Sequence, residues 1–396
     1  MIYLDNAATT RTKREVVNAM LPYFTEHYGN PESVHVAAEV PKLAIGCAEQ
    51  GVTDLLHSYG KGRIVFTSGG TESNNMVFKL CQPPKQMALT IITSATEHKS
   101  VLEPARACDR AVLRILTPDY KGSISANALQ PMDIPACCVI SIMHMNNETG
   151  VINDVYKIGE MLKRYSDLDV FYHVDCAQSA GELPIFVNDM NADFVSISSH
   201  KIHGPKGIGC LWVSDRAMDR IEDGRNLSLI LGGGQQDGFR AGTMDVPSIV
   251  GFGKACELAA TEPSKEYNGS LAQAFIEKLN ESCSERKIKF KINFDDEQTH
   301  DNKILSIRFP GADAETVVMV ASQKGLCISN GAACNSVLSE PSYVLLSSGI
   351  KPDAARNSVR ISFSSDNSLG DVTAGAEILA NSVEEVLALN LTQVVS

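Results

Sequence analysis

The chain has 396 residues, 44% of them hydrophobic, with 47 acidic against 35 basic side chains and a formal net charge of -12. This length is sufficient for two domains with sizeable cores, and the excess of acidic residues argues against a broad nonspecific surface for nucleic acid. The sequence shows neither a secretory signal nor an apolar stretch of membrane-spanning length, so we expect a cytoplasmic protein without a membrane partner. The eleven cysteines form no repeated C-x-x-C pattern, which indicates neither a disulfide framework nor structural zinc, and we expect most to be buried.

The first predicted helix begins at residues 12–15, TKRE, which have the spacing of a capping box. Apolar residues then recur at helical intervals as far as Phe24, and the preceding residues 5–10 are expected to form a connecting loop. Residues 29–33, GNPES, form a turn cluster in which Asn30 is either a turn former or a ligand contact.

A strand predicted at 63–67 is followed by SGGTESNN at 68–75 and by the helix-like residues 76–80. A glycine-bearing turn from strand to helix presents backbone amides and a hydroxyl at a helix N-terminus, where a phosphate group is favoured. The turn is no Walker loop, because the Lys-Ser/Thr pair is missing. The residues by themselves therefore leave two interpretations open, a phosphate cup and a plain tight turn.

Further strands are predicted at 90–93, 138–142, 171–174, 194–197 and 210–213, with helix-like stretches between several of them. This alternation predicts an α/β fold whose mainly parallel sheet is covered on both faces, with ligand loops at the carboxyl ends of the strands. Chemically rich loops lie at those ends, at 97–99 (EHK), 144–148 (HMNNE), 175–178 (DCAQ) and 198–201 (SSHK).

Lys201 stands in the loop between two of these predicted buried strands. A lysine at the end of a buried strand is partly desolvated, which lowers its pKa and leaves free amine to form a Schiff base with a carbonyl compound. The alternative is a lysine whose stem packs while its ammonium group reaches water.

The later part of the chain predicts a second, smaller domain. A glycine-rich stretch at 231–243 is either a flexible loop or one that touches a phosphate. After an apolar helix near 249–258, the polar residues 260–265 mark a linker, and helical and strand patterns then restart. The last helix is expected to contain Val372, Ile378, Leu379, Val383 and Val386.

Taken together, these loops resemble those of the fold-type I enzymes that use pyridoxal 5'-phosphate (PLP), and specifically the NifS/IscS-like cysteine desulfurases of the class V aminotransferase group. The resemblance runs nearly end to end, from YLDNAATT at 3–10, through GNP at 29–31, GTESNN at 70–75 and TEHK at 96–99, to residues 336–345. It implies a large domain at 16–258 with a mainly parallel seven-stranded sheet, a smaller C-terminal α+β domain at 259–396, and an N-terminal segment at 1–15 that joins the small domain.

The resemblance also implies roles in binding PLP. Lys201 matches the lysine that holds PLP covalently and moves protons, and Asp175 matches the carboxylate that keeps the pyridine nitrogen protonated, so that the ring accepts electrons. His98 corresponds to a histidine stacked on the ring, and Gln178 to an amide bonded to the phenolic oxygen. The positions around the phosphate are matched by Gly70, Thr71, Ser198 and His200, and by Thr243, which reaches the phosphate of the opposite subunit and so implies a homodimer.

For the substrate, Arg360 matches the arginine that clamps the amino-acid carboxylate, a task for which its planar pair of donors is suited. Without the family, an arginine on a solvated strand face is the simpler interpretation. Asn30 and Asn147 match asparagines placed near the substrate and cofactor. Cys334, within SNGAACNS at 329–336, matches the nucleophile of the family, and its small neighbours suit a mobile carrier of sulfur.

The activity implied is the PLP-dependent removal of sulfur from L-cysteine, which gives L-alanine and a persulfide on Cys334. The persulfide then passes to an acceptor protein, for iron-sulfur cluster assembly or for sulfur modification of tRNA or DNA. We expect no metal site and no direct contact with nucleic acid.

Three stretches depart from the common family pattern. Residues 332–336 read AACNS where the family usually has Ser-Ala-Cys-Thr-Ser, Gln236 and Asp237 replace Glu-Arg, and residues 364–366, SSD, replace Leu-Gly-Arg. These departures are compatible with the chemistry, but they leave the choice of acceptor and the edges of the pocket open.

Three alternatives remain at this stage. The first is another PLP enzyme of the group, such as a selenocysteine lyase or an aminotransferase, and the second is a non-catalytic scaffold of a sulfur pathway that keeps the fold. The third is a metal hydrolase that would use His173, Asp175, Cys176, His200 and His203.

Overall fold

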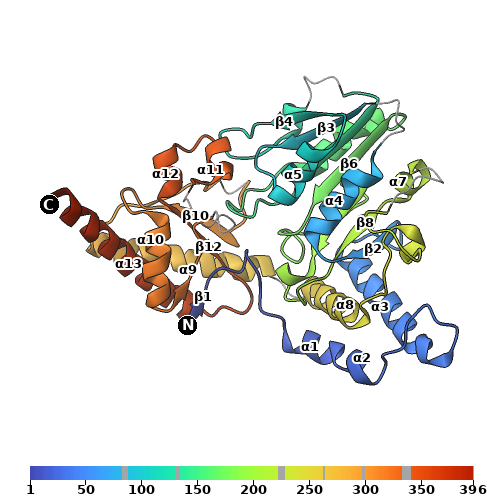
Figure 1. Cartoon of the computed structure of the whole chain (residues 1–396). Helices are drawn as coiled ribbons and strands as arrows, with labels where there is room; N and C mark the ends of the chain where they lie inside the picture. The colour runs from blue at the N-terminus through green and yellow to red at the C-terminus, as the bar shows by residue number, and fades with distance from the viewer. Residues whose placement is uncertain are drawn as a thin grey trace.

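The computed structural model describes residues 1–82, 88–129, 134–221, 228–261, 264–296, 299–331 and 340–395. Within these ranges, no helix combines the length and the apolar character that crossing a bilayer requires. Figure 1 shows a broad twisted sheet with helices packed around it and the C-terminal elements gathered at one end of the molecule, with the N-terminus beside those elements.

A seven-stranded sheet dominates the larger part of the molecule, with the strand order β2-β8-β7-β6-β5-β3-β4. Strands β4, β3, β5, β6 and β7 run parallel, whereas β8 is antiparallel to both β7 and β2. The mainly parallel seven-stranded sheet is therefore confirmed. The strand bounds are β2 (Arg63–Thr67), β3 (Leu89–Ser94), β4 (Ala111–Leu116), β5 (Cys137–Met143), β6 (Asp169–Asp175), β7 (Phe194–Ser198) and β8 (Gly209–Val213).

The burial of the strands explains which of them the sequence predicted. Every residue of β3, β5, β7 and β8 is buried, so these strands read as continuous apolar runs. Strand β4 lies at the edge of the sheet and buries only Leu116 of its six residues. Its position was not among the predicted ones, because a half-exposed edge strand carries no clear hydrophobic pattern.

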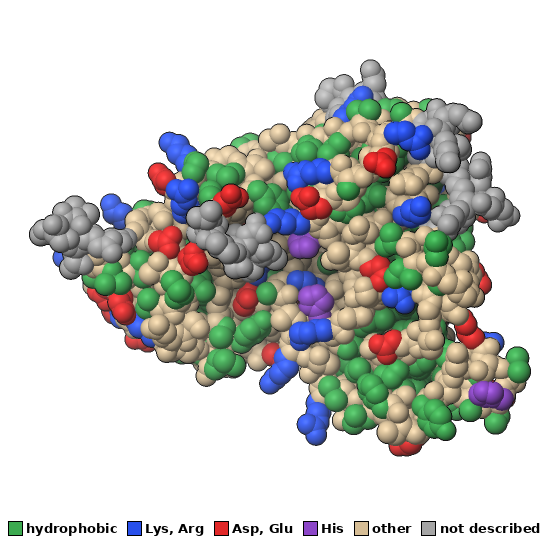
Figure 2. All heavy atoms as spheres, in the orientation of Figure 1, with side chains coloured by type: hydrophobic (Ala, Val, Ile, Leu, Met, Phe, Trp, Pro, Cys, Tyr) green, Lys and Arg blue, Asp and Glu red, His purple; other side chains and the backbone are tan. Residues whose placement is uncertain are grey.

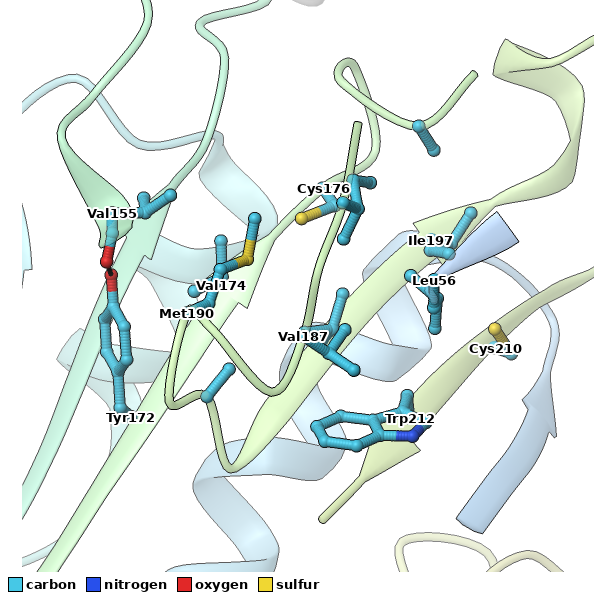
Figure 3. Close-up of a cluster of buried hydrophobic side chains, with 14 of the residues drawn as sticks. Leu56, Val155, Tyr172, Val174, Cys176, Val187, Met190, Ile197, Cys210 and Trp212 are labelled. Carbon is cyan, nitrogen blue, oxygen red and sulfur yellow. Dashed lines mark hydrogen bonds between the residues drawn. The ribbon is translucent and has the colours of Figure 1, made fainter. Parts of the chain in front are cut away.

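Helices cover both faces of this sheet, as predicted. On one face Ile92 and Ile140 pack in a cluster with residues of α3, α6 and α8, and on the other Ile91 and Val139 pack with residues of α4, α5 and α7. Figure 3 shows part of the first cluster, in which the Tyr172 hydroxyl donates to the carbonyl of Val155 over 3.0 Å. The helix bounds are α3 (Glu39–Leu55), α4 (Gly70–Leu80), α5 (Lys99–Ala107), α6 (Val155–Leu162), α7 (Asp215–Arg220) and α8 (Val246–Thr261).

The first helix differs from its prediction in both of its ends. Helix α1 spans Arg14–Met20, and a separate short helix, α2, spans Pro22–Thr25. The capping box is not formed, because the Thr12 hydroxyl donates to the carbonyl of Gly204 over 3.2 Å instead of accepting from the helix. Pro22 cannot donate to the preceding turn, so it begins α2 rather than extending α1.

The C-terminal elements form a second core. A three-stranded antiparallel sheet, β12-β10-β9, packs with the long helices α9 and α13 around Phe275, Phe309 and Phe363. The last helix contains all five predicted residues and buries four of them fully, while Ile378 is partly buried. The bounds are α9 (Ser264–Glu285), β9 (Lys291–Ile292), β10 (Ile304–Arg308), α10 (Ala314–Gln323), β11 (Leu326–Cys327), α11 (Tyr343–Ser347), α12 (Pro352–Arg356), β12 (Ser358–Ser362) and α13 (Leu369–Val395).

The N-terminus belongs to this second core rather than to the large sheet. Strand β1 (Ile2–Tyr3) pairs in parallel with β11, and Leu4 is buried among the aromatic residues of the C-terminal part. These separate cores support the division into 1–15, 16–258 and 259–396, which remains our proposal.

Among the ten cysteines that lie in the described ranges, none is in a disulfide. Seven are buried, Cys108 and Cys327 are partly exposed, and Cys47 is exposed. Cys334 lies outside the described residues.

Candidate functional site

A cavity of about 1050 Å³ opens where the carboxyl ends of the sheet strands meet the N-terminal segment and strand β12. Figure 2 shows histidine and basic side chains gathered near the middle of this face, between the two parts of the molecule. Parallel strands bring their carboxyl ends to the same rim, which is why loops distant in the sequence converge here. The predicted site residues that line the cavity are Gly70, Thr71, His98, Asn147, Asp175, Gln178, Ser198, His200, Lys201 and Arg360.

Lys201 ends a single 3-10 turn (Ser199–Lys201) that follows β7 directly. Its Nζ donates to the carbonyls of Ala7 and Ala8, over 2.5 and 3.0 Å. Burial, followed by the positive charges of Arg360 and Lys303, lowers the pKa of Lys201 to about 8. A fraction of neutral amine is therefore present near neutral pH, as the sequence predicted, and the N-terminal loop that supplies the two carbonyls was not foreseen in this role.

Asp175 is the last residue of β6, and its side chain is held by two donors. Its Oδ2 accepts from Asn74 Nδ2 over 2.9 Å, and its Oδ1 accepts from the backbone amide of Ala177 over 2.9 Å. Asn74 lies inside α4, and sequence analysis assigned it no role. The pair of asparagines at 74 and 75 was the available signal, but neighbouring residues of a helix point about 100° apart, so only one of them can face inward. Asn74 is buried, whereas Asn75 donates to the Thr71 carbonyl of its own helix.

His98 precedes α5 and caps it. Its Nδ1 accepts from the Ser100 amide over 3.1 Å and lies 2.7 Å from the Ser100 hydroxyl, which in turn accepts from Asn74 Nδ2 over 2.9 Å. One chain of hydrogen bonds thus joins the imidazole to the Asp175 carboxylate. Burial lowers the pKa of His98, which favours the neutral ring at pH 7.

The glycine turn after β2 is the first turn of α4 itself. Gly69 has φ of 144°, a conformation that residues with a side chain rarely adopt, and Gly70 begins the helix. Gly209 allows this close approach, since a Cβ there would lie 2.8 Å from Gly69 Cα. Gly70 and Thr71 of the first turn line the cavity together with Ser198. The first amides of a helix have no partner within the helix, so this end of the cavity suits an anion.

His200 belongs to the same 3-10 turn as Lys201 and also lines the cavity. Its Nδ1 is 3.1 Å from the Thr9 hydroxyl, and burial, followed by the nearby charges of Lys201 and Lys206, lowers its pKa to about 4. The imidazole is therefore neutral at pH 7 and contributes a hydrogen bond rather than a charge.

Arg360 projects from β12 and is 4% exposed. It pairs with Asp5 over 2.7 Å through one terminal nitrogen and donates to the carbonyl of Asn147 over 3.0 Å through the other. Its Nε is buried and has no hydrogen-bond partner among the described residues. The interpretation of Arg360 as an arginine on a solvated strand face is therefore wrong.

Several other buried polar atoms of cavity-lining residues also have no partner in the described part of the chain. They are Asn74 Oδ1, Asn147 Oδ1 and Gln178 Oε1. Leaving a buried polar group without a hydrogen bond costs about 1–3 kcal/mol, so such a cluster indicates that a polar ligand completes the site.

Two predicted residues do not line the cavity. The Asn30 and Thr243 side chains are exposed, and Asn30 Oδ1 accepts from the Glu32 amide over 3.0 Å, as a turn former does. Their roles remain predictions, as does that of Cys334, which lies outside the described residues together with Ala332 and Asn335.

The departures at Gln236 and Asp237 have structural roles. The Gln236 amide accepts from the Phe66 amide over 2.7 Å and donates to the Phe66 carbonyl over 2.9 Å, so it satisfies the open edge of β2. Asp237 pairs with Arg63 at the same edge. Asp366 pairs with Arg11 over 3.1 Å on the far side of the site.

The residues of the metal-hydrolase alternative are engaged otherwise. His173 contacts the Ser141 and Ser196 hydroxyls over 2.8 and 2.9 Å, and both its nitrogens are used. Burial raises the pKa of the Cys176 thiol far above its ordinary value. In the ranges that the structure covers, no three histidine, cysteine or acidic side chains are grouped so that they could hold a metal ion.

Comparison with known proteins agrees with this geometry. Residues 2–374 match the family described as aminotransferase class-V. The cysteine desulfurase IscS of Clostridium botulinum is 34% identical over 389 residues, which cover 97% of this chain and 94% of the relative. A mitochondrial cysteine desulfurase of Eremothecium gossypii is 38% identical over 387 residues, which cover 95% of this chain and 74% of the relative.

Solved structures extend the match to the whole fold. A NifS-like protein superposes with a TM-score of 0.83 at 28% identity, covering 98% of this chain and 99% of the other. SspA, solved in complex with cysteine, gives a TM-score of 0.73 at 33% identity, covering 92% of this chain and 99% of the other. The chain belongs to the class V aminotransferase family of PLP-dependent enzymes and, within it, to the NifS/IscS-like cysteine desulfurases.

Proposed function

We propose that the chain removes sulfur from L-cysteine with the help of PLP, giving L-alanine and a persulfide on Cys334. The observation that carries this proposal is the convergence of Lys201, Asp175, His98 and Arg360 on one cavity in a chain of this family. The cysteine complex of the relative SspA supports the choice of substrate.

The residues present fit PLP. Lys201 supplies the amine for covalent attachment, and the buried carboxylate of Asp175 supplies the partner that a protonated pyridine nitrogen needs. Gln178, whose side-chain oxygen has no partner among the described residues, and His98 line the same cavity. For the phosphate we propose Gly70, Thr71, Ser198 and His200, with Thr243 contributed to the opposite subunit.

When bound, PLP supplies an electron sink for negative charge that develops at the substrate Cα. Lys201 is the proposed base for the Cα proton, because a pKa of about 8 allows its amine to accept and return a proton near neutral pH. The hydrogen-bond chain through Ser100 and Asn74 holds His98 and Asp175 in fixed orientations while this happens.

Arg360 is the proposed partner of the substrate carboxylate. Its buried Nε lacks a partner in the described residues, and the guanidinium is already oriented by Asp5 and the Asn147 carbonyl. A carboxylate that approaches this face gains a charge-assisted hydrogen bond without requiring the arginine to reorient. We propose that Asn147 and Asn30 act near the same substrate.

Cys334 is the proposed sulfur acceptor within the chain. An S–S bond forms between its thiolate and the substrate sulfur as the substrate Cβ–S bond breaks, and the electron pair stays on the carbon side, which takes up a proton to become alanine. Gly331 and Glu340, the described residues on either side of 332–339, both line the cavity, which supports this assignment.

We further propose that the enzyme is a homodimer and that an acceptor protein takes the persulfide sulfur. A dimer is supported by exposed apolar side chains that lie between α1 and α2, on α2, on α3 and in the segment between α2 and α3. We call this cluster the N-terminal apolar face, and it comprises Leu21 (56% exposed), Phe24 (60%), Tyr28 (77%), Val34 (106%), Val36 (77%) and Leu43 (70%).

The test uses purified protein and its Cys334→Ala variant, each incubated with L-cysteine, and a thiol reductant is added when sulfide release is measured, because reduction of the persulfide frees the sulfide. We expect the wild-type protein to release alanine and to gain the mass of one sulfur on the peptide that contains Cys334. The variant should keep bound PLP, seen by its visible absorbance, and should lose at least 100-fold in sulfide release. Unchanged sulfide release from the variant would exclude Cys334 from the mechanism.

The same preparation separates the alternatives. Purified protein that cannot bind PLP would support the non-catalytic scaffold. A preference for selenocysteine over cysteine, with activity that survives the loss of Cys334, would favour a selenocysteine lyase.

A further inference from the structure

A second, small cavity of about 40 Å³ has Lys201 in its lining and shares no other described residue with the large cavity of the proposed cofactor. This is space for about one water molecule. Lys201 is therefore in contact with both cavities. The small cavity is also lined by Lys303, whose side chain is an unusual one to bury.

Lys303 immediately precedes β10 in the C-terminal part of the molecule and is 5% exposed. Its Nζ donates to the carbonyl of Gln178 over 3.3 Å and lies 3.9 Å from Glu182 Oε2, both in the large domain. Glu182 is fixed in turn by Asn268 Nδ2 over 2.9 Å. The Lys303 backbone is also held, because its amide donates to Asp301 Oδ1 over 2.8 Å.

The positive charge of Lys303 is therefore held in place in the lining of the small cavity, which Lys201 also lines. Burial and the charges of Arg360 and Lys303 act to lower the pKa of Lys201, whereas Asp5 and Asp175 act to raise it. The remaining charged or titratable side chains that line either cavity are Lys13, His98, Lys99, Glu103, Arg106, Glu148, Glu182, His200, His203, Lys206, Glu315, Glu340 and Tyr343. Lys303 differs from Arg360 in that it lines only the small cavity, where the proposed substrate and cofactor do not bind.

We propose that Lys303 is a positioning residue for the reaction: from the small cavity it holds the Gln178 backbone and presents a fixed positive charge to the nitrogen of Lys201. This inference rests on the proposed attachment of PLP at Lys201. Packing alone does not explain a lysine here, because a methionine or leucine would fill the space without burying an ammonium group. The charge keeps Lys201 ready to give up its proton.

The test is a pH titration of the visible absorbance of PLP-loaded protein, which reports protonation at the Lys201 nitrogen. Lys303→Gln removes the charge and keeps a donor for the Gln178 carbonyl, whereas Lys303→Arg keeps the charge. We expect the midpoint to rise by about half a pH unit or more in Lys303→Gln and to stay unchanged in Lys303→Arg, because a neighbouring positive charge disfavours a second one.

Lys157→Gln is the matched control, since it removes one positive charge from a side chain that is 75% exposed. Its midpoint should equal that of the wild-type protein. If the Lys303→Gln midpoint equals the wild-type value within error, this inference is overturned while the proposed function stands. The same holds if Lys303→Arg shifts the midpoint as much as Lys303→Gln does, because packing rather than charge would then be the cause. Wild-type protein that shows no visible absorbance with PLP overturns the proposed function and this inference with it.

Discussion

The nitrogen of Lys201 is held by two backbone carbonyls rather than by a carboxylate. A carboxylate partner would stabilise the ammonium form and raise the pKa, whereas burial beside Arg360 and Lys303 lowers it to about 8. The N-terminal loop thus orients the side chain without fixing its charge. The geometry suits a residue that must be a neutral amine for part of its cycle.

The first prediction concerns the pH dependence of PLP attachment. In protein stripped of cofactor, the rate of attachment should rise with pH and level off above about 8, because only the neutral amine of Lys201 reacts and its pKa is about 8. An exposed lysine would continue to gain reactivity to about pH 10. The growth of visible absorbance after PLP is added measures the rate, and a profile that keeps rising past pH 9 would show that the lysine is not perturbed.

The second prediction concerns Glu97, next to His98 and fully buried. Burial raises its pKa to about 8, although the Met143 amide and the Ser94 hydroxyl donate to its Oε1 and oppose the rise. In the unfolded chain this carboxyl titrates near 4.5, so the stability it contributes is present at acid pH and is lost as pH rises to about 8. From pH 5.5 to 8.5 we expect Glu97→Gln to gain on the order of 1–3 kcal/mol in unfolding free energy relative to wild type.

Urea unfolding at the two pH values measures this gain, and Glu72→Gln is its control. Burial acts to raise the pKa of Glu72 as well, but hydrogen bonds from Arg240 and Ser68 outweigh it and lower the pKa. Glu72 is therefore ionised at both pH values in folded and unfolded chains. Its replacement should change the unfolding free energy by the same amount at each pH. If the unfolding free energies of wild type and Glu97→Gln depend on pH in the same way, the prediction of a raised pKa for Glu97 is contradicted.

At the scale of single elements, the turn from β2 into α4 determines where a phosphate can bind. Gly69 adopts a positive φ and α4 begins at once, so the first amides of the helix, from Gly70 onward, have no acceptor within the helix. The edge of the same strand is closed by the Gln236 side chain, which bonds both backbone groups of Phe66. The replacement at 236 thus acts on the stability of the strand that carries the turn.

The third prediction tests this turn with two alanine substitutions. Gly69→Ala should lower the unfolding free energy by about 1–3 kcal/mol and weaken PLP binding, because alanine is strained at a φ of 144°. Gly46→Ala, inside α3 and with no atom within 4 Å of the new Cβ, should instead raise it by about 0.5–1 kcal/mol. Urea unfolding measures the stability of each variant, and PLP titration measures its affinity for PLP. Equal stability for the two variants would show that alanine at position 69 is not strained.

At the scale of the whole molecule, the site forms where two cores meet. Ala7 reaches it from the N-terminal segment, Lys201 from the large sheet and Arg360 from the C-terminal sheet. No one of these segments contains the site. Movement of one core against the other would therefore change the distance between the proposed cofactor and the arginine proposed to bind the substrate.

The fourth prediction concerns the N-terminal apolar face. Wild-type protein should sediment as a dimer, and Leu43→Glu should shift it to a monomer, because a charge buried in an apolar interface is strongly unfavourable. The control is Val112→Glu on the edge strand β4, where the side chain is 53% exposed, and it should leave the dimer intact. Sedimentation that shows a wild-type monomer, or a Leu43→Glu dimer of unchanged affinity, would contradict the proposed interface.

The sequence by itself determined the elements and the chemistry that they carry. Strands that are buried along all or nearly all of their length read as apolar runs, so β2, β3, β5, β6, β7 and β8 were predicted close to their observed bounds. Their carboxyl ends and the loops that follow supplied Asp175, Ser198 and Lys201. The parallel sheet follows from the alternation of strands and helices, which local patterns reveal.

The tertiary structure alone decided how residues remote in the chain meet. The contacts of Asn74 with Asp175, of Lys201 with the Ala7 carbonyl and of Lys303 with Gln178 join positions 101, 194 and 125 residues apart, and no local pattern records them. Edge strand β4 was not predicted, because its partial burial leaves no clear hydrophobic pattern. The capping box predicted at Thr12 does not form, because the Thr12 hydroxyl makes a tertiary hydrogen bond to the Gly204 carbonyl instead of a local one. Local periodicity reports burial, whereas the pairing of polar groups is decided by the packing of the whole chain.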